Sequence, residues 1–198
     1  MLLASDLDNT VINYETAFRD LAQQIYDIPN EILSRGKVGI RDFLNAEGRQ
    51  ADFTHLQFLA YGPEIYLASL HDGFLEFLSG YLKVNHFLEI YSHKSKYPIS
   101  GGDFDLHKSS LEFIKKNILS EFGNDVLRVK FFPNKQSKIA AINTGNPNFF
   151  IDDLIDILLS LDRGIAPVLF TGNPEQKIST VDYNGLKISN WKQLSEIL

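Results

Sequence analysis

Short apolar runs alternate with longer segments of helical periodicity along this 198-residue chain. An apolar run of four to eight residues is typical of a buried strand, and central parallel strands are apolar at nearly every position. We therefore expect strands at Leu2–Leu7, Phe87–Ser92, Val126–Phe132, Asn148–Ile151, Ala166–Phe170 and Leu186–Ile188. Because these runs alternate with helical segments, the pattern predicts an α/β fold with a mainly parallel central sheet and crossover helices.

A long helical stretch separates the first two predicted strands. One helix face is formed by residues spaced three and four apart, at Phe18, Leu21, Ala22 and Ile25. A crossover between parallel strands needs only about a dozen residues, so the excess predicts an inserted helical module. We expect the insertion to span residues 14–82, and the sheet domain to comprise residues 1–13 and 83–198.

Composition and charge exclude several classes of protein. The formal net charge of −6 favours neither nucleic acid nor an acidic membrane as a partner. The absence of cysteine excludes disulfides, thiolate metal sites and a cysteine nucleophile. No apolar run has the length of a membrane span, and the start of the chain lacks the features of a signal peptide. A cytoplasmic location is therefore expected.

Two of the apolar runs end in paired acids. Asp6 and Asp8 follow the first run, and Asp152 and Asp153 follow the fourth. Carboxylates this close repel each other unless a cation lies between them, and carboxylate oxygens suit a hard metal such as Mg²⁺. In an open parallel sheet the carboxyl ends of the strands form the ligand-binding edge. The alternatives are a solvated turn for the first pair and a helix cap for the second.

A hydroxyl and two lysines complete the candidate chemistry. Ser92 ends the second strand, where its hydroxyl could bind a phosphate oxygen, although turn and cap residues are also commonly serine. Lys135 and Lys138 begin a short helix, whose N-terminus adds partial positive charge for an anion. A single lysine is more often a solvated surface residue, and nothing local selects between these two. Glu89 interrupts the apolar run that leads to Ser92, and the sequence provides no reason for it.

The order of these elements is acid pair, hydroxyl, lysine, acid pair, each after its own strand-like run. This order resembles the four motifs of the haloacid dehalogenase (HAD) superfamily over the core from Leu2 to about Phe170. The segment Asp6-Leu7-Asp8-Asn9-Thr10 is similar to the family's Asp-x-Asp-x-Thr motif. The segments Ser92-His93-Lys94 and Phe150-Ile151-Asp152-Asp153-Leu154 also resemble a poorly characterised bacterial branch. The resemblance implies a HAD-like Rossmannoid three-layer sandwich with a helical cap.

The resemblance also implies catalytic roles. Asp6 would be the nucleophile that forms an aspartyl-phosphate, and Asp8 the general acid and then the general base. Mg²⁺ would be held by Asp6, by the backbone carbonyl of Asp8 and by Asp152, with support from Asp153 or Asp156. The dehalogenases of the family lack the second aspartate and need no metal. Asp8 therefore favours phosphoryl transfer over cleavage of a carbon–halogen bond.

Phosphate and substrate contacts follow from the same resemblance. Ser92 and backbone N–H groups near Asn9 would hold phosphate oxygens. Lys138 is preferred as the catalytic lysine because Ser-Lys-Ile-Ala-Ala-Ile resembles the branch pattern, and Lys135 is the alternative. Further substrate contacts are expected from Asn9, Thr10, His93 and Lys135. Asn9 stands where glycine is commoner, and asparagine keeps the turn because it tolerates left-handed backbone.

The segment 14–82 falls where the superfamily places its first type of cap, which covers the site and supplies specificity contacts. Candidate contacts in it are Lys37, Arg41, His55, Gln57 and Tyr61. The expected function is hydrolysis of a small phosphomonoester with Mg²⁺. A phosphotransferase or mutase on the same scaffold, and a non-catalytic HAD-like binding protein, are the alternatives.

Overall fold

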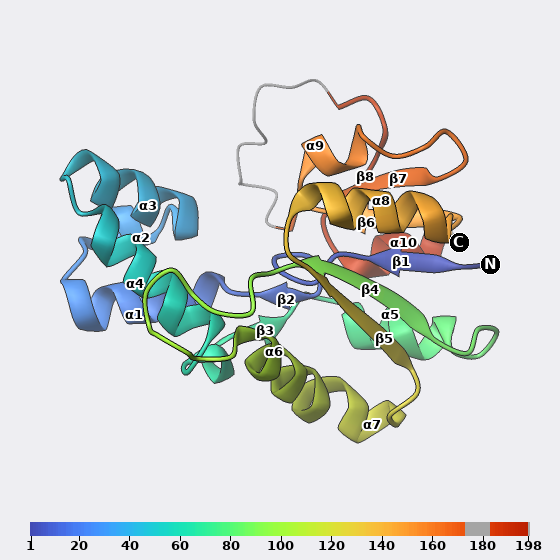
Figure 1. The fold of residues 1–198 in the computed structure, drawn as a ribbon, viewed down its shortest axis with the longest axis horizontal. Coiled ribbons are helices and arrows are strands. Elements are labelled where there is room, and N and C mark those ends of the chain that lie inside the picture. Colours follow the sequence, from blue (N-terminus) through green and yellow to red (C-terminus); the bar gives the residue numbers. More distant parts are fainter. Residues whose placement is uncertain (173–182, 198) are drawn as a thin grey trace. The chain divides into compact units, whose positions relative to one another are not determined.

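The centre of the computed structural model, which describes residues 1–172 and 183–197, is a six-stranded parallel sheet (Figure 1). Its strands are β1 (Leu3–Ser5), β4 (Leu88–His93), β5 (Leu127–Phe132), β6 (Phe149–Asp152), β7 (Ala166–Phe170) and β8 (Leu186–Ile188). All six strands predicted from the apolar runs are confirmed, with ends that differ by at most two residues. The predicted α/β class is therefore correct.

Strand order places β1 in the middle of the sheet. The order is β5-β4-β1-β6-β7-β8, so the chain builds outward from β1 on one side and then on the other. Ser5 is in register with Ile90 of β4 and with Ile151 of β6. The residues that follow these three strands therefore meet at one edge of the sheet, at the switch point where α/β proteins bind ligands.

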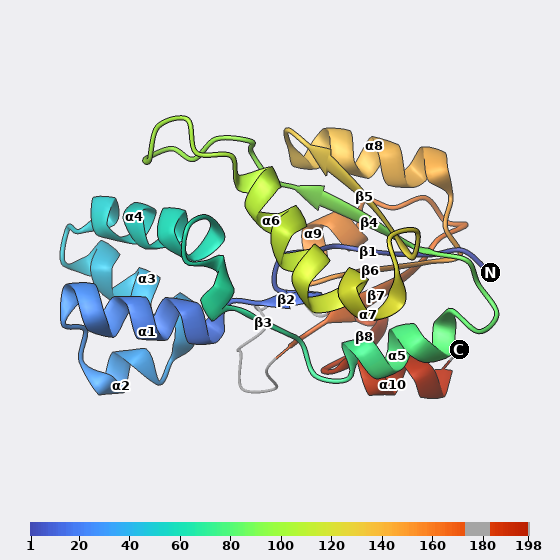
Figure 2. The same ribbon diagram turned by 90° about the horizontal axis from the view of Figure 1, so that it is seen from below.

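Helices cover both faces of this sheet (Figure 2). On one face lie α8 (Lys135–Gly145) and α9 (Ile155–Leu158), whose Ile142 and Ile157 join a buried cluster with Phe150 of β6. On the other face lie α5 (Phe74–Tyr81) and α10 (Trp191–Ile197). Trp191 is fully buried there, with its ring centroid 5.0 Å from that of Phe74.

A hydrogen bond joins α10 to the loop that follows β1. The indole Nε1 of Trp191 donates to the backbone carbonyl of Thr10 at 2.9 Å, and both groups are buried. A buried indole N–H needs an acceptor, and a buried carbonyl needs a donor. Each group therefore provides the hydrogen-bond partner that the other needs. This bond fixes the loop that carries the first acid pair against helix α10.

Glu89 is tolerated within β4 because two neighbours donate hydrogen bonds to its carboxylate, one of them a lysine of opposite charge. Its carboxylate accepts a hydrogen bond from the Tyr91 hydroxyl at 2.6 Å and from Lys130 Nζ on β5 at 2.9 Å. Burial alone would raise the pKa of Glu89, but these two hydrogen bonds hold it below its ordinary value. Lys130 comes from the next strand, in register with Tyr91, so its partnership with Glu89 becomes visible only once the sheet has formed.

The described chain forms two compact units, of which the sheet unit comprises residues 1–12, 70–94, 115–172 and 183–197. It also contains the short helices η2 (Lys115–Leu119) and α7 (Ser120–Phe122). The helical unit comprises residues 13–69 and 95–114. Its elements are α1 (Glu15–Tyr26), α2 (Asn30–Leu33), α3 (Gly36–Ala46), α4 (Gln50–Tyr61), η1 (Ile65–Leu67) and α6 (Leu106–Ile114). The short strands β2 (Ile12–Asn13) and β3 (Ser69–Leu70) pair where the chain passes between units.

The helical unit has its own apolar core. Phe18 of α1 stacks on Phe53 of α4, with ring centroids 5.9 Å apart. Of the predicted face of α1, residues Phe18, Leu21 and Ala22 are buried, but Ile25 is 45% exposed because it lies in the last turn. Within the described ranges, none of the helices combines the length and apolar character needed to span a bilayer.

The division into units differs in two places from the expected insertion at 14–82. Helix α5 lies with the sheet, because its Phe74 and Phe77 pack on Trp191. Residues 95–114 lie with the helical unit, where Phe104 packs edge-on against Phe58 of α4. Both contacts join residues far apart in sequence, and helical periodicity does not reveal them. A capping role for the helical unit stays a prediction.

Replacing Glu89 with alanine should destabilise the protein, because the Tyr91 hydroxyl and Lys130 Nζ lose their shared acceptor in a partly buried place. We expect the free energy of unfolding to fall by about 1–3 kcal/mol in urea denaturation. Glu112→Ala is the control, since its side chain is 66% exposed and lies 3.9 Å from Lys108. Equal effects of the two substitutions would contradict this account of Glu89.

Candidate active site

Asp6 is the first residue after β1, and it is almost completely buried. Its backbone N–H donates to the carbonyl of Ile151 at 2.8 Å, which fixes its position beside β6. Asp152, the last residue of β6, is fully buried and holds the N–H of Leu154 at 2.8 Å through Oδ1. The sheet thus brings two carboxylates together that are 146 positions apart in the sequence.

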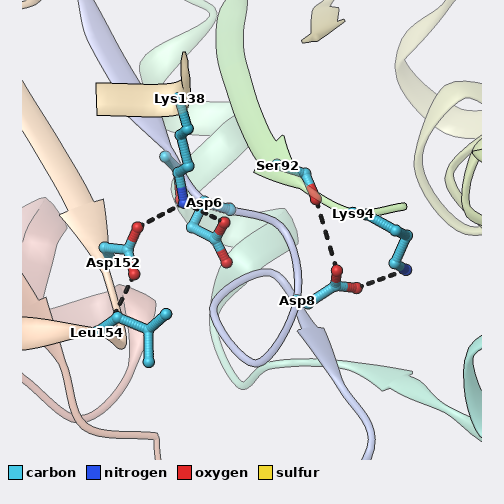
Figure 3. Close-up of polar contacts among 8 residues, drawn as sticks. Asp6, Asp8, Ser92, Lys94, Lys138, Asp152 and Leu154 are labelled. Carbon is cyan, nitrogen blue, oxygen red and sulfur yellow. Dashed lines mark hydrogen bonds and ion pairs between the residues drawn. The ribbon is translucent and has the colours of Figure 1, made fainter. Parts of the chain in front are cut away.

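Lys138 lies between these two carboxylates (Figure 3). Its Nζ is 2.5 Å from Asp6 Oδ1 and 2.6 Å from Asp152 Oδ2, and its side chain is fully buried. Helix α8 carries this lysine in its first turn. Asn134 caps the helix by accepting the backbone N–H of Ser137 at 2.9 Å. The structure therefore brings Lys138 to the two carboxylates, and its catalytic role stays a prediction.

Lys135 points elsewhere. Its Nζ forms an ion pair with Asp156 at 2.6 Å, and both side chains are largely exposed. This contact also lowers the pKa of Asp156. Of the two residues proposed to support the metal, Asp156 is thus engaged by a surface lysine, whereas Asp153 lies at the carboxylate cluster. A substrate contact from Lys135 stays a prediction.

Three carboxylates could hold a metal ion. Asp6, Asp152 and Asp153 each offer one oxygen, and these oxygens lie within 4.8 Å of one another. Lys138 pairs with Asp6 and Asp152, and three carboxylates this close repel one another, a repulsion that a divalent cation would offset. Oxygen-only donors suit Mg²⁺ or Ca²⁺ rather than a soft metal. The residues present therefore fit the expected ion. The expected ligand from Asp8 is its backbone carbonyl, which stays a prediction.

Burial and charge strongly perturb this cluster. Burial, followed by repulsion from Asp152 and Asp8, raises the pKa of Asp6 from 3.8 to about 7, although Lys138 opposes the shift. Burial alone would lower the pKa of Lys138, but Asp6 and Asp152 raise it above its ordinary value. The lysine therefore stays charged, and Asp6 is a carboxylate whose ionised form depends on nearby cations.

A tight turn after β1 separates Asp8 from Asp6. Asn9 has a φ of 62°, which confirms the expectation that asparagine adopts left-handed backbone here. Its N–H donates to the carbonyl of Ile12 at 2.8 Å, so that amide already has a partner within the loop. Thr10 is fully buried, and its Oγ1 has no hydrogen-bond partner among the described residues. Substrate contacts from Asn9 and Thr10 stay predictions.

The Asp8 side chain lies on the other side of the loop from Asp6, next to β4 (Figure 3). Lys94 Nζ donates to Asp8 Oδ1 at 2.8 Å, and Ser92 Oγ lies 3.5 Å from Asp8 Oδ2. Lys94 is buried, with 5% of its side chain exposed. Ser92 is thus close to the first motif as expected, but its described neighbour is Asp8. Its role toward phosphate stays a prediction.

Lys94 is the residue that the sequence analysis did not assign. One signal for it was available: side chains two positions apart on a strand lie on the same face, so Lys94 continues the direction of Ser92 just beyond β4. His93, between them, is half-buried and faces the other way. Burial, and then the charge of Lys138, lowers the pKa of His93. His93 is therefore neutral near pH 7, and its substrate contact stays a prediction.

Comparison with known proteins identifies the fold. No family model and no curated protein matches the sequence. The chain is similar to a predicted phosphoglycolate phosphatase from Haemophilus somnus 129pt, with a TM-score of 0.59 and 12% identity over 99% of this chain and 96% of that chain. It is also similar to a HAD-superfamily hydrolase from Ehrlichia chaffeensis, with a TM-score of 0.53 and 17% identity over 99% and 94%.

A third similar structure is an L-2-haloacid dehalogenase, with a TM-score of 0.56 and 15% identity over 99% of this chain and 97% of that chain. The three structures share one architecture but carry names of different activities. The chain therefore has the HAD-like fold, as the motif order indicated. At identities this low, the likeness establishes the fold, and the activity has to be argued from the site.

The raised pKa of Asp6 predicts how pH affects the metal-free protein. Between about pH 4 and 7 the folded state keeps a proton that the unfolded chain has released, so stability falls as pH rises through this interval. Asp6→Asn removes the cost of the buried charge. We expect the variant to unfold about 1–3 kcal/mol less readily than wild type at pH 8, with the advantage gone at pH 4.

This comparison is made by urea denaturation in the presence of a chelator. Asp42→Asn, whose side chain is 61% exposed, is the matched control and should show no such trend. A difference between Asp6→Asn and wild type that does not change with pH would show that Asp6 has an ordinary pKa in the folded state.

Mg²⁺ binding can be measured without any substrate. We expect calorimetry to detect one ion per chain, and Asp152→Asn to weaken binding roughly tenfold or more because a carboxylate ligand is lost. Asp156→Asn should leave the affinity near that of wild type, since its carboxylate pairs with Lys135. Affinity should rise as pH increases through about 7, where Asp6 loses its proton. Equal losses in the two variants would contradict the cluster as the binding site.

Proposed function

We propose that the protein is a HAD-superfamily hydrolase that cleaves a small phosphomonoester, with Asp6 as the nucleophile and Mg²⁺ as the cofactor. One observation carries this proposal. Two aspartates two positions apart have separate environments: Asp6 contacts Lys138 within a three-carboxylate cluster, and Asp8 contacts Lys94 and Ser92 beyond the turn. Pairs of carboxylates in different environments commonly divide nucleophilic and acid–base work between them.

In the first step, a carboxylate oxygen of Asp6 attacks phosphorus, and the bond from phosphorus to the ester oxygen breaks. Asp8 enters this step in its protonated form and gives its proton to the departing alkoxide, so the alcohol leaves neutral; the proton that Asp8 takes from water in the second step restores this form. Lys138 offsets the charge on Asp6 and so favours the ionised carboxylate that attacks. The product of this step is an aspartyl-phosphate, and one difficult displacement has been divided into two easier ones.

In the second step, Asp8 takes a proton from a water molecule as the water attacks the phosphorus of the aspartyl-phosphate. Inorganic phosphate is released and the Asp6 carboxylate is restored. A metal bound by Asp6, Asp152 and Asp153 would neutralise phosphate oxygens and orient the phosphoryl group for in-line attack. Hydrogen bonds from Lys138 and from the N–H of Leu154 fix the orientation of the Asp152 carboxylate.

The likeness to a dehalogenase structure raises C–halogen cleavage as an alternative. By the motif resemblance, the dehalogenases lack the second aspartate and use no metal. In this chain Asp8 is present and engaged by Lys94, and a carboxylate cluster suited to a cation lies beside Asp6. These two features support phosphoryl transfer over dehalogenation.

The test is phosphate release from a panel of phosphomonoesters, with and without Mg²⁺. We expect turnover that requires the metal and falls at least about 10³-fold in Asp6→Asn, because the nucleophile is lost. Asp42→Asn, on the surface of the helical unit, should retain wild-type activity.

Phosphate appearing on an added alcohol instead of in solution would indicate a phosphotransferase. An Mg²⁺-binding protein that turns over no panel member would favour the binding-protein alternative. Halide release from a 2-haloacid that persists in a chelator would contradict the proposal outright.

A further inference from the structure

The two aspartates of the first motif pair with different lysines. Lys138, from α8, reaches Asp6 and Asp152, while Lys94, from the segment after β4, reaches Asp8 at 2.8 Å. The two ammonium groups come from different elements and contact different carboxylates. The catalytic lysine of the mechanism is Lys138. Lys94 has no part in the steps described above.

Lys94 is well placed to hold the Asp8 carboxylate in one orientation. Its side chain is 5% exposed, whereas that of Asp8 is 20% exposed. The ammonium, directly after β4, is therefore the more buried of the two groups, and we take the carboxylate on the loop as the group being held. Ser92 Oγ, 3.5 Å from the other carboxylate oxygen, lies on the same side of Asp8. Asp8 is thus drawn toward β4 by both neighbours.

We propose that Lys94 is a positioning residue, which orients the Asp8 carboxylate toward the leaving-group oxygen and the attacking water without contacting the phosphate itself. This inference rests on the proposed phosphatase function. It adds a residue that the motif resemblance does not assign. Orientation matters here because a general acid must lie within hydrogen-bond reach of the oxygen it protonates, and a displacement of about 1 Å can cost about 10²-fold in rate.

A positioning role and a phosphate-binding role predict different dependence on the leaving group. An aryl phosphate such as p-nitrophenyl phosphate has a leaving group that departs without a proton, whereas an alkoxide needs one from Asp8. The value of kcat/KM reports the steps up to formation of the aspartyl-phosphate. Loss of Asp8 orientation should therefore lower kcat/KM for an alkyl phosphate far more than for the aryl phosphate.

The test compares Lys94→Met with wild type on p-nitrophenyl phosphate and on the best alkyl phosphate of the panel. We expect kcat/KM to fall about 10²-fold for the alkyl phosphate and by less than about threefold for the aryl phosphate. Hydrolysis of the aspartyl-phosphate also needs Asp8, so a burst of p-nitrophenol should precede a slower steady state. Lys94→Arg keeps the charge and should recover part of the alkyl activity.

Lys96→Met is the matched control, because Lys96 lies two residues further along, is 53% exposed and pairs with Asp105. It should behave as wild type on both substrates. Equal losses of kcat/KM on the alkyl and aryl phosphates in Lys94→Met would overturn the proposal, since they would indicate that Lys94 binds the phosphate. An unchanged kcat/KM for both substrates would overturn it equally.

A structural readout separates this inference from the proposed function. Crystal structures of wild type and Lys94→Met should show the Asp8 carboxylate leaving its wild-type rotamer, with Asp6, Lys138 and Asp152 unmoved. An Asp8 carboxylate that keeps its place would overturn the positioning role, whatever the enzyme's activity. If wild type hydrolyses no phosphate ester, the proposed function fails, and the rotamer of Asp8 still decides what Lys94 does. Should Lys94→Met fail to fold, Lys94→Gln carries the same comparison, because it also removes the charge.

Discussion

The buried ion pairs of Lys138 with Asp6 and Asp152 are the interaction on which the site depends. A lysine with no exposed side-chain surface is tolerated only if opposite charge surrounds it, and here two strand ends supply that charge. The same contacts join helix α8 to β1 and β6, so the geometry of the sheet and of the site are set together. Removing both carboxylates would leave the charge of Lys138 uncompensated in the interior.

This cluster of acids lowers the stability of the metal-free protein and at the same time provides a site suited to a cation. Asp6 is buried beside other acids, which raises its pKa to about 7 and makes the ionised form expensive in the metal-free protein. A cation bound by the three carboxylates would relieve that cost and leave a nucleophile that is desolvated but charged. Functional sites commonly contain charged groups whose pKa values are shifted by burial and by like charges, and the rest of the fold supplies the stability that such a site lacks.

The strands and the position of the site could be predicted because both follow from local sequence. Central parallel strands are apolar throughout, and Asp6 and Asp152 come directly after two of them. The choice of Lys138 came from a resemblance, because the two lysines of α8 look alike until the sheet places one beside Asp6 and the other beside Asp156. The placement of α5 with the sheet and the partners of Glu89 were not predictable, since they are contacts across strands and layers. The pairing of Lys94 with Asp8 spans 86 positions and leaves no periodic signal.

The hydrogen bond from Trp191 to the Thr10 carbonyl also bears on how the protein is made. The first acid pair precedes most of its structural neighbours in the chain: its strand lies between β4 and β6, and its loop is held by an indole synthesised 181 residues later. Domains with such long-range contacts complete their packing late in synthesis. The loop that carries the first acid pair therefore acquires its final geometry only after Trp191 has been synthesised, so a nascent chain that lacks α10 cannot hold the candidate site in its final arrangement.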